Sequence, residues 1–197
     1  MDMPILQRVR DILLRPKDEW PEIRDEKTTV REIYLSYAVI LAGIPVVARL
    51  IGSTVIGMSF FGIRYRAPFL SSVGYAAVSY VLSLAGLYLF ALIVEGLAPR
   101  FGSEKDFVRT MKLSVYSSTA YWAAGILFIV PGLWFVGIIL SLYGLYLLYL
   151  GLPVMLHTPK ERSAQYFAVI VVAGLILFAL VSLITTLIFP EGRMGAA

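Results

Sequence analysis

The sequence contains no cysteine and a single histidine, so several kinds of chemistry lack the residues to carry them. Without cysteine there is no disulfide, no thiolate nucleophile and no cysteine metal site. His157 has neither a second histidine nor a cysteine to share a metal, which argues against a zinc centre and against Ser–His catalysis. No glycine-rich phosphate loop of P-loop spacing is present either. We therefore expect no metal, no cofactor and no enzymatic activity.

Charge is also scarce. Only 15% of the 197 residues are charged and 59% are hydrophobic, and the mean hydropathy is +0.81. Soluble domains carry about 25% charged residues, so this composition does not suit a surface facing water. The first thirty residues are rich in charge and have no apolar stretch typical of a cleavable signal peptide. The net charge of +4 is attributed to loops and anionic lipid headgroups rather than to nucleic acid.

Long apolar runs take up most of the chain. A helix needs about 20 apolar residues to cross a bilayer, and the runs lack the period-two alternation of a membrane barrel. We predict an all-α polytopic bundle, with Pro131-Gly132 as a tight turn between the third and fourth spans. The five predicted spans are Ile33–Ile56, Phe69–Leu97, Leu113–Val130, Leu133–Leu156 and Ala164–Phe189.

Two helix starts carry capping-box spacing. Thr29 stands three residues before Glu32, ahead of the first span, and Thr158 stands three residues before Glu161, ahead of the fifth. Pro159 would then occupy the first helical position, where proline is favoured.

Lysine and arginine are distributed unevenly over the predicted connections. Thirteen fall on one side of the bundle, whereas only Arg64, Arg66 and Arg193 fall on the other. The positive-inside rule then places the N-terminus in the cytoplasm and the C-terminus outside. The expected organisation is a cytoplasmic segment over 1–32, a membrane domain over 33–190 and a short external tail over 191–197.

The N-terminal segment has its apolar residues at helical spacing and basic residues beside them, which is typical of an amphipathic helix at a membrane surface. Arg8, Arg10 and Arg15 would meet anionic headgroups, and Trp20, between two prolines, would anchor the chain at the interface. The same apolar face also suits packing beneath the bundle. The two interpretations are compatible, and the sequence leaves both open.

Several stretches, in order, resemble the Yip domain family (Ypt/Rab-interacting proteins) in its prokaryotic form. The stretches are Leu13-Leu14-Arg15-Pro16-Lys17-Asp18-Glu19-Trp20 with Ile23, Gly102 with Phe107, Lys112-Leu113-Ser114-Val115-Tyr116-Ser117-Ser118, and Gly151-Leu152-Pro153-Val154-Met155-Leu156 joined through Thr158-Pro159-Lys160-Glu161-Arg162 to Tyr166. The resemblance implies a five-span domain with a cytoplasmic N-terminus and, in eukaryotic members, a link to small GTPases and secretory membranes. This sequence lacks the Asp-Leu-Tyr-Gly-Pro signature of those members, which favours a prokaryotic plasma-membrane protein.

Arg49 is the one basic residue inside a predicted span, and ionisable groups there are the first functional suspects. Because small residues surround it on the helix, we expect it to face the bundle. It would form an anion or headgroup site opening outward, together with Arg64 and Arg66. Alternatively, it snorkels to the outer headgroups and holds the helix in register.

The other candidate residues are an acid and a set of tyrosines. Glu95, with Tyr88 two turns earlier, would be a proton or cation gate or a partner for nearby basic residues. Tyr143, Tyr146 and Tyr149 form a stripe that would line a polar pathway or serve helix packing. We expect Arg49 and Glu95 to lie at opposite depths and not to pair.

These features favour a non-enzymatic membrane protein that acts as a scaffold or membrane-organising component. The alternative is a small transporter, channel or lipid-translocating protein that uses Arg49, Glu95 and the tyrosine stripe. The expected partner is a bilayer with anionic headgroups. Small-residue pairs such as Ala48/Gly52 also suit a membrane-protein partner or self-association.

Overall fold

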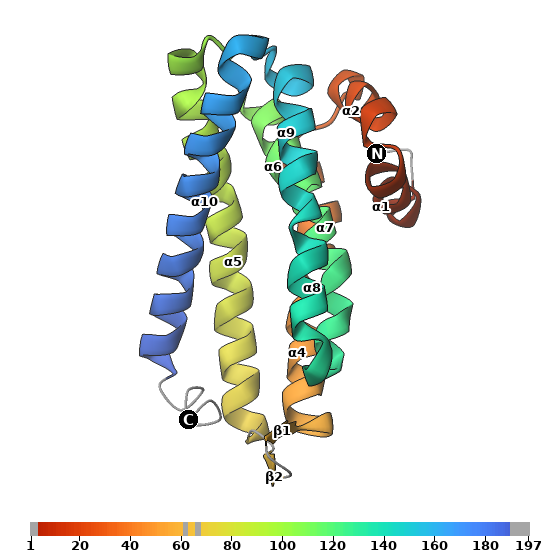
Figure 1. Ribbon diagram of the computed structural model, residues 1–197, viewed down its shortest axis with the longest axis vertical. Helices are drawn as coiled ribbons and strands as arrows, with labels where there is room; N and C mark the ends of the chain where they lie inside the picture. Colours follow the sequence, from red (N-terminus) through yellow and green to blue (C-terminus); the bar gives the residue numbers. More distant parts are fainter. Residues whose placement is uncertain (1–3, 61–62, 66–67, 190–197) are drawn as a thin grey trace.

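The computed structural model describes residues 4–60, 63–65 and 68–189, and it is a helical bundle drawn out along one axis (Figure 1). The elements up to the second long helix are α1 (Ile5–Leu14), α2 (Pro16–Asp25), α3 (Val30–Ile33), the π-helical turn η1 (Tyr34–Ala38), α4 (Val39–Ile51), the π-helical turn η2 (Gly52–Ile56), β1 (Met58–Phe60), β2 (Ile63–Tyr65) and α5 (Phe69–Leu97). The elements that follow are η3 (Ala98–Phe101), α6 (Phe107–Ser117), α7 (Thr119–Ala124), η4 (Gly125–Ile129), η5 (Pro131–Leu133), α8 (Trp134–Ser141), α9 (Tyr143–Leu156) and α10 (Lys160–Ile188). β1 and β2 form a short antiparallel hairpin at the end of the bundle opposite α2 (Figure 1).

Among the described residues, four helical segments are long and apolar enough to cross a membrane: Val30–Ile56, Phe69–Phe101, Trp134–Leu156 and Lys160–Ile188. They correspond to the predicted first, second, fourth and fifth spans. The predicted third span, Leu113–Val130, is not a single helix, because α6, α7 and η4 divide it.

Serine back-bonding accompanies the break after α6. The hydroxyl of Ser114 donates to the carbonyl of Thr110 at 2.9 Å, and that of Ser118 donates to the carbonyl of Ser114 at 2.8 Å. Such back-bonding competes with the helix ladder and bends helices. The residues of this stretch from Thr110 to Ser117 are all buried, so the broken segment lies inside the protein.

Glycine lets the broken segment approach the first span closely. A Cβ placed on Gly125 would lie 2.5 Å from the Cβ of Pro45, and one placed on Gly52 would lie 2.8 Å from the carbonyl oxygen of Ile129. Both contacts require the absence of a side chain. The chain then reverses through η5 at the predicted Pro131-Gly132 turn, and α8 packs back against α7.

The two predicted helix caps have different outcomes. The Thr29–Glu32 capping box is present at the start of α3, with both reciprocal hydrogen bonds formed. The second prediction was wrong, because Pro159 is the N-cap of α10 and no side chain caps that helix. Thr158 instead donates to the carbonyl of Leu152 and contacts the hydroxyl of Ser103 at 2.8 Å, so its oxygen joins two neighbouring connections.

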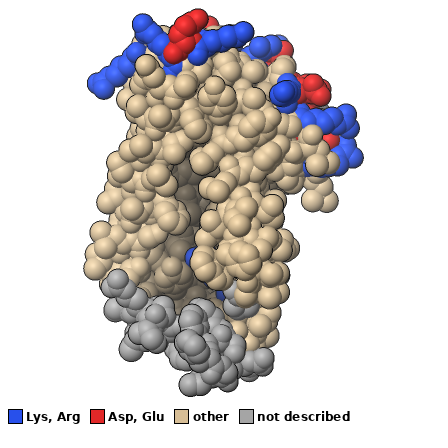
Figure 2. Space-filling view, viewed as in Figure 1, with Lys and Arg blue, Asp and Glu red and all other residues tan. Residues whose placement is uncertain are grey.

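Charged side chains gather at one end of the molecule, which we call the charged end (Figure 2). The connections between α5 and α6 and between α9 and α10 lie there, and α1 and α2 project beside it as a lateral arm (Figure 1). Trp20 and Ile23 of α2 and Ile12 of α1 are fully buried against the bundle. The hydrophobic core therefore continues from the bundle into the N-terminal arm.

Candidate functional site

The residues singled out in the spans do not come together in one site. Arg49 lies near the end of α4 that is remote from the charged end, whereas Glu95 lies close to the end of α5 that reaches it. The expectation that these two side chains lie at opposite depths agrees with the arrangement of α4 and α5 in Figure 1.

The side chain of Arg49 is exposed, and its orientation toward the bundle stays a prediction. Its backbone position lies on the face of α4 that carries the buried Ala42 and Pro45. Its guanidinium carbon lies 5.2 Å from the centre of the Phe128 ring, a distance typical of cation–π contact. The side chain of Arg64 and the whole of Arg66 lie outside the described residues, so the expected cluster of three arginines is not tested.

A long hollow runs between the α5–α10 side of the molecule and the α8–α9 side (Figure 2). Its visible lining is almost entirely uncharged, and basic atoms are visible deep within it toward the end remote from the charged one.

Tyr88 and Glu95 share α5 but have different surroundings. The ring of Tyr88 contacts Tyr34 and Phe107 edge-on, with centroid distances of 6.2 and 5.4 Å, and the residue remains 40% exposed. Glu95 is half-buried. Tyr88 therefore belongs to an aromatic group on the face between the first span and α5.

The three tyrosines of the stripe on α9 have different partners. Tyr143 donates its hydroxyl to the carbonyl of Leu13 at 3.0 Å, which fastens α9 to the end of α1. Tyr146 lies 5.3 Å from the ring of Tyr143, whereas Tyr149 contacts Phe167 of α10 edge-on. These contacts favour the packing interpretation of the stripe.

Two of the four residues expected at the membrane interface are instead inside the protein. Arg8 is 4% exposed and forms ion pairs with Glu19 and, at 2.7 Å, with Glu26. Trp20 is fully buried against Gly151, where a Cβ would lie 2.8 Å from the indole ring. Arg10 and Arg15 remain exposed. Arg8 and Trp20 therefore lie on the face of the arm that packs against the bundle.

Lys112 of α6 completes this buried polar junction. Its ammonium group donates to the carbonyls of Ile23 and Glu26, each at 2.6 Å, at the C-terminal end of α2. A cation is favourable there because the last carbonyls of a helix have no partner within it. Lys112 therefore caps α2 from another helix.

Burial shifts the Glu19 carboxyl of the junction toward its neutral form. Removal from water raises the pKa of the Glu19 carboxyl, although Arg8 opposes the shift. The junction is therefore held by hydrogen bonds and packing that compensate for desolvated charge.

Sequence reasoning missed Glu19, Glu26 and Lys112. Each lies in a stretch rich in charge, where an exposed side chain is the usual expectation. The available signal was the helical spacing of Arg8 with Ile5 and Ile12, which places that arginine on the apolar face of α1. A buried arginine requires acidic partners, and these can lie on the next helix.

Comparison with known proteins finds one family model and two relatives that cover most of the chain. A sequence model of the Yip1 domain matches residues 10–183. The inner membrane protein YohC of Escherichia coli strain K12 is 24% identical over 191 residues, which cover 95% of this chain and 98% of that protein. YohC of E. coli O6:H1 matches with the same identity and coverage. No solved structure matches significantly.

Proposed function

This chain belongs to the Yip1 domain family, and on that premise we propose that it is a five-span prokaryotic plasma-membrane protein acting as a non-enzymatic scaffold. The charged end faces the cytoplasm and displays the α1–α2 arm there. The C-terminus lies on the external side. The name of the E. coli relative, an inner membrane protein, supports this location.

The burial of the broken segment supports a fifth crossing. Irregular backbone is tolerated at membrane depth only where protein or water surrounds it. α6 packs against α5 and α9, and η4 packs against α4. A segment enclosed in this way does not need the hydropathy of a helix that faces lipid, so α6, α7 and η4 together form the third crossing.

The arm is the feature that favours a scaffold. Its inner face is fixed by Trp20 and the Arg8 ion pairs, whereas its outer face leaves Leu6 81% and Leu14 72% exposed. Arg10 and Arg15 accompany these leucines on the exposed surface. A rigidly held surface that combines apolar and basic groups suits both a membrane surface and a partner protein.

In-cell photocrosslinking tests the scaffold role directly. A photoreactive amino acid replaces Leu14 on the arm or, as a matched control, Phe178 on α10, which is 68% exposed. We expect discrete protein adducts from position 14 and no protein adducts from position 178. Absence of protein adducts at position 14 from correctly inserted protein would overturn the scaffold role.

Arg49 favours a second candidate function, the movement of an ion or lipid. An exposed arginine in an apolar span is energetically unfavourable without a compensating partner. The hollow in Figure 2 contains basic atoms among uncharged ones. Flux from proteoliposomes tests this function, with Arg49→Ala expected to abolish it. Equal flux in wild type and variant would exclude Arg49 as the transport site.

A further inference from the structure

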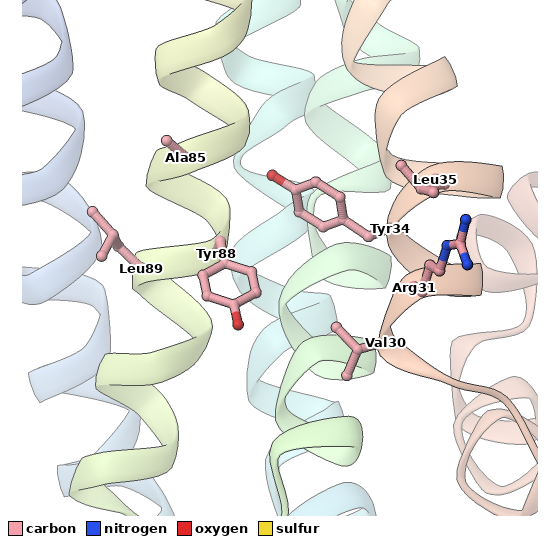
Figure 3. Close-up of a pocket in the computed structure, with 7 residues that line it drawn as sticks. All are labelled: Val30, Arg31, Tyr34, Leu35, Ala85, Tyr88 and Leu89. Carbon is pink, nitrogen blue, oxygen red and sulfur yellow. The ribbon is translucent and has the colours of Figure 1, made fainter.

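An open groove lies between the start of the first span and α5, on the face shown in Figure 3. Its volume is about 710 Å³, and its lining residues are Val30, Arg31, Tyr34, Leu35, Ala85, Tyr88 and Leu89. Ligand pockets commonly measure about 300–1,000 Å³. Six of the seven lining residues are apolar or aromatic, and Arg31 supplies the single charge.

The local backbone explains why the groove exists. The first span changes from α3 to the π-helical turn η1 at Tyr34, and π-helical turns are frequent at functional sites. The hydroxyl of Tyr34 donates to the carbonyl of Leu84 at 2.6 Å, which fixes the ring between the two helices. Ala85 is too small to fill the space beside it.

Two hydrogen bonds keep the helices at this spacing. Tyr34 bonds from the first span to α5, and Tyr80 of α5 donates in return to the carbonyl of Val39 at 2.6 Å. Tyr34 and Tyr88 meet edge-on across the groove (Figure 3). Because the Tyr34 hydroxyl is already bonded, the floor of the groove presents mainly carbon atoms to an occupant.

Arg31 lies at the end of the groove where the first span begins. It is exposed, and within the described part of the chain no acidic side chain comes within ion-pair distance of it. The adjacent Glu32 is engaged elsewhere, since its carboxylate accepts from the backbone N–H of Thr29 at 2.8 Å. The guanidinium is thus available for a phosphate.

We propose that this groove binds one anionic phospholipid. The phosphate pairs with Arg31, and an acyl chain lies along Tyr34, Ala85 and Tyr88. A cation at the helix start followed by an apolar surface matches the order of groups in a lipid that enters from the leaflet at the charged end. A water-soluble anion would find only the guanidinium, and an uncharged lipid would leave it unpaired.

The proposal depends on Val30–Ile56 crossing the membrane, and it does not depend on the scaffold role of the arm. The groove residues and the arm residues are different, so variants in one leave the other intact. Failure of lipid binding therefore does not alter the expected crosslinks from Leu14.

Native mass spectrometry of the full-length protein released from detergent tests the proposal. Phosphatidylglycerol and phosphatidylcholine with identical acyl chains are titrated separately, and glycerol phosphate serves as the headgroup without chains. We expect one phosphatidylglycerol molecule to bind tightly. Phosphatidylcholine should bind with an affinity at least about tenfold lower, since one charged contact accounts for such a factor. Glycerol phosphate should not bind.

Two variants locate the site. Arg31→Gln should weaken phosphatidylglycerol about tenfold and phosphatidylcholine by less, because choline already neutralises the phosphate charge of the latter. The exposed Arg100→Gln should change neither. Ala85→Phe should fill the groove and weaken both lipids, with the exposed Ala77→Phe of the same helix as its control.

Three outcomes would overturn the proposal. The first is equal affinity for the two lipids in wild type. The second is an unchanged affinity for phosphatidylglycerol in Arg31→Gln. The third is a wild-type protein that dimerises together with an Ala85→Phe variant that retains its lipid but is monomeric, which would assign the groove to a second copy of the chain.

Discussion

At the scale of single residues, the junction between the arm and the bundle depends on a few positions where a larger side chain does not fit. Trp20, Gly151 and Leu113 meet where α2, α9 and α6 converge. A Cβ on Gly151 would lie 2.5 Å from Leu113 Cδ1 and 2.8 Å from the Trp20 ring. The glycine is required here by space and not by backbone conformation.

Gly151→Ala should therefore destabilise the protein. Overpacking a dense core costs about 1–3 kcal/mol, and neither the indole nor the backbone of α9 can move freely. Thermal unfolding in detergent should show a lower Tm for Gly151→Ala. Gly96→Ala is the matched control, because nothing lies within 4 Å of its added Cβ. Equal Tm values for the two variants would show that Trp20 does not pack on Gly151.

Lys112→Met should loosen the arm. Methionine preserves the length of the buried side chain but removes both hydrogen bonds to the end of α2. The loss should be about 2 kcal/mol, because two buried carbonyls lose a charged partner. Hydrogen exchange of the α2 amides measures it, with the exposed Lys105→Met as control. Unchanged protection in Lys112→Met would mean that this lysine does not cap α2.

Acid should strengthen the junction through Glu19. Burial raises the pKa of this carboxyl above its unfolded value, so the folded protein binds the proton more tightly than the unfolded chain. The resulting stabilisation is complete below about pH 4.3 and is lost as pH rises through the folded pKa. The Tm difference between pH 7.5 and pH 5 should be smaller in Glu19→Gln than in the wild-type protein. An identical difference would show that another group titrates.

At the scale of elements, the sequence predicts a helix correctly where a long apolar run is continuous. The prediction fails for a segment that is buried by other helices and is less apolar. The four spans that meet the membrane criterion were all predicted from such runs. The third was expected as one helix, yet Ser114 and Ser118 divide it, and its enclosure by other helices is a tertiary property. Thr158 shows the same limitation, because its partner Ser103 is distant in sequence.

The bond from Tyr80 to Val39 links two of these elements across the bundle. Tyr80→Phe removes only the hydroxyl, so we expect a loss of about 1 kcal/mol in stability. Thermal unfolding of Tyr80→Phe against the exposed Tyr146→Phe measures this contribution. A Tm equal to that of Tyr146→Phe would exclude a structural role for the Tyr80 hydroxyl.

At the scale of the whole molecule, composition alone indicates a membrane protein, and the uneven basic residues correspond to a charged end that is visible in Figure 2. The sites were less predictable. Arg8 was expected at the surface and is buried. Helical spacing places a residue on a face, but which face is covered depends on the packing of neighbouring elements.

The proposed topology has five spans and places the charged end in the cytoplasm. The absence of cysteine makes single-cysteine labelling the most direct test. Lys17→Cys and Lys160→Cys would report on the charged end, and Phe69→Cys on the opposite end. A membrane-impermeant maleimide is applied to intact cells and then to permeabilised cells.

We expect Phe69→Cys to be labelled in intact cells, and Lys17→Cys and Lys160→Cys to be labelled only after permeabilisation. Labelling of Lys160→Cys in intact cells would contradict the proposed topology. The segment from α6 to η4 would then not cross the membrane, and the protein would have four spans instead of five.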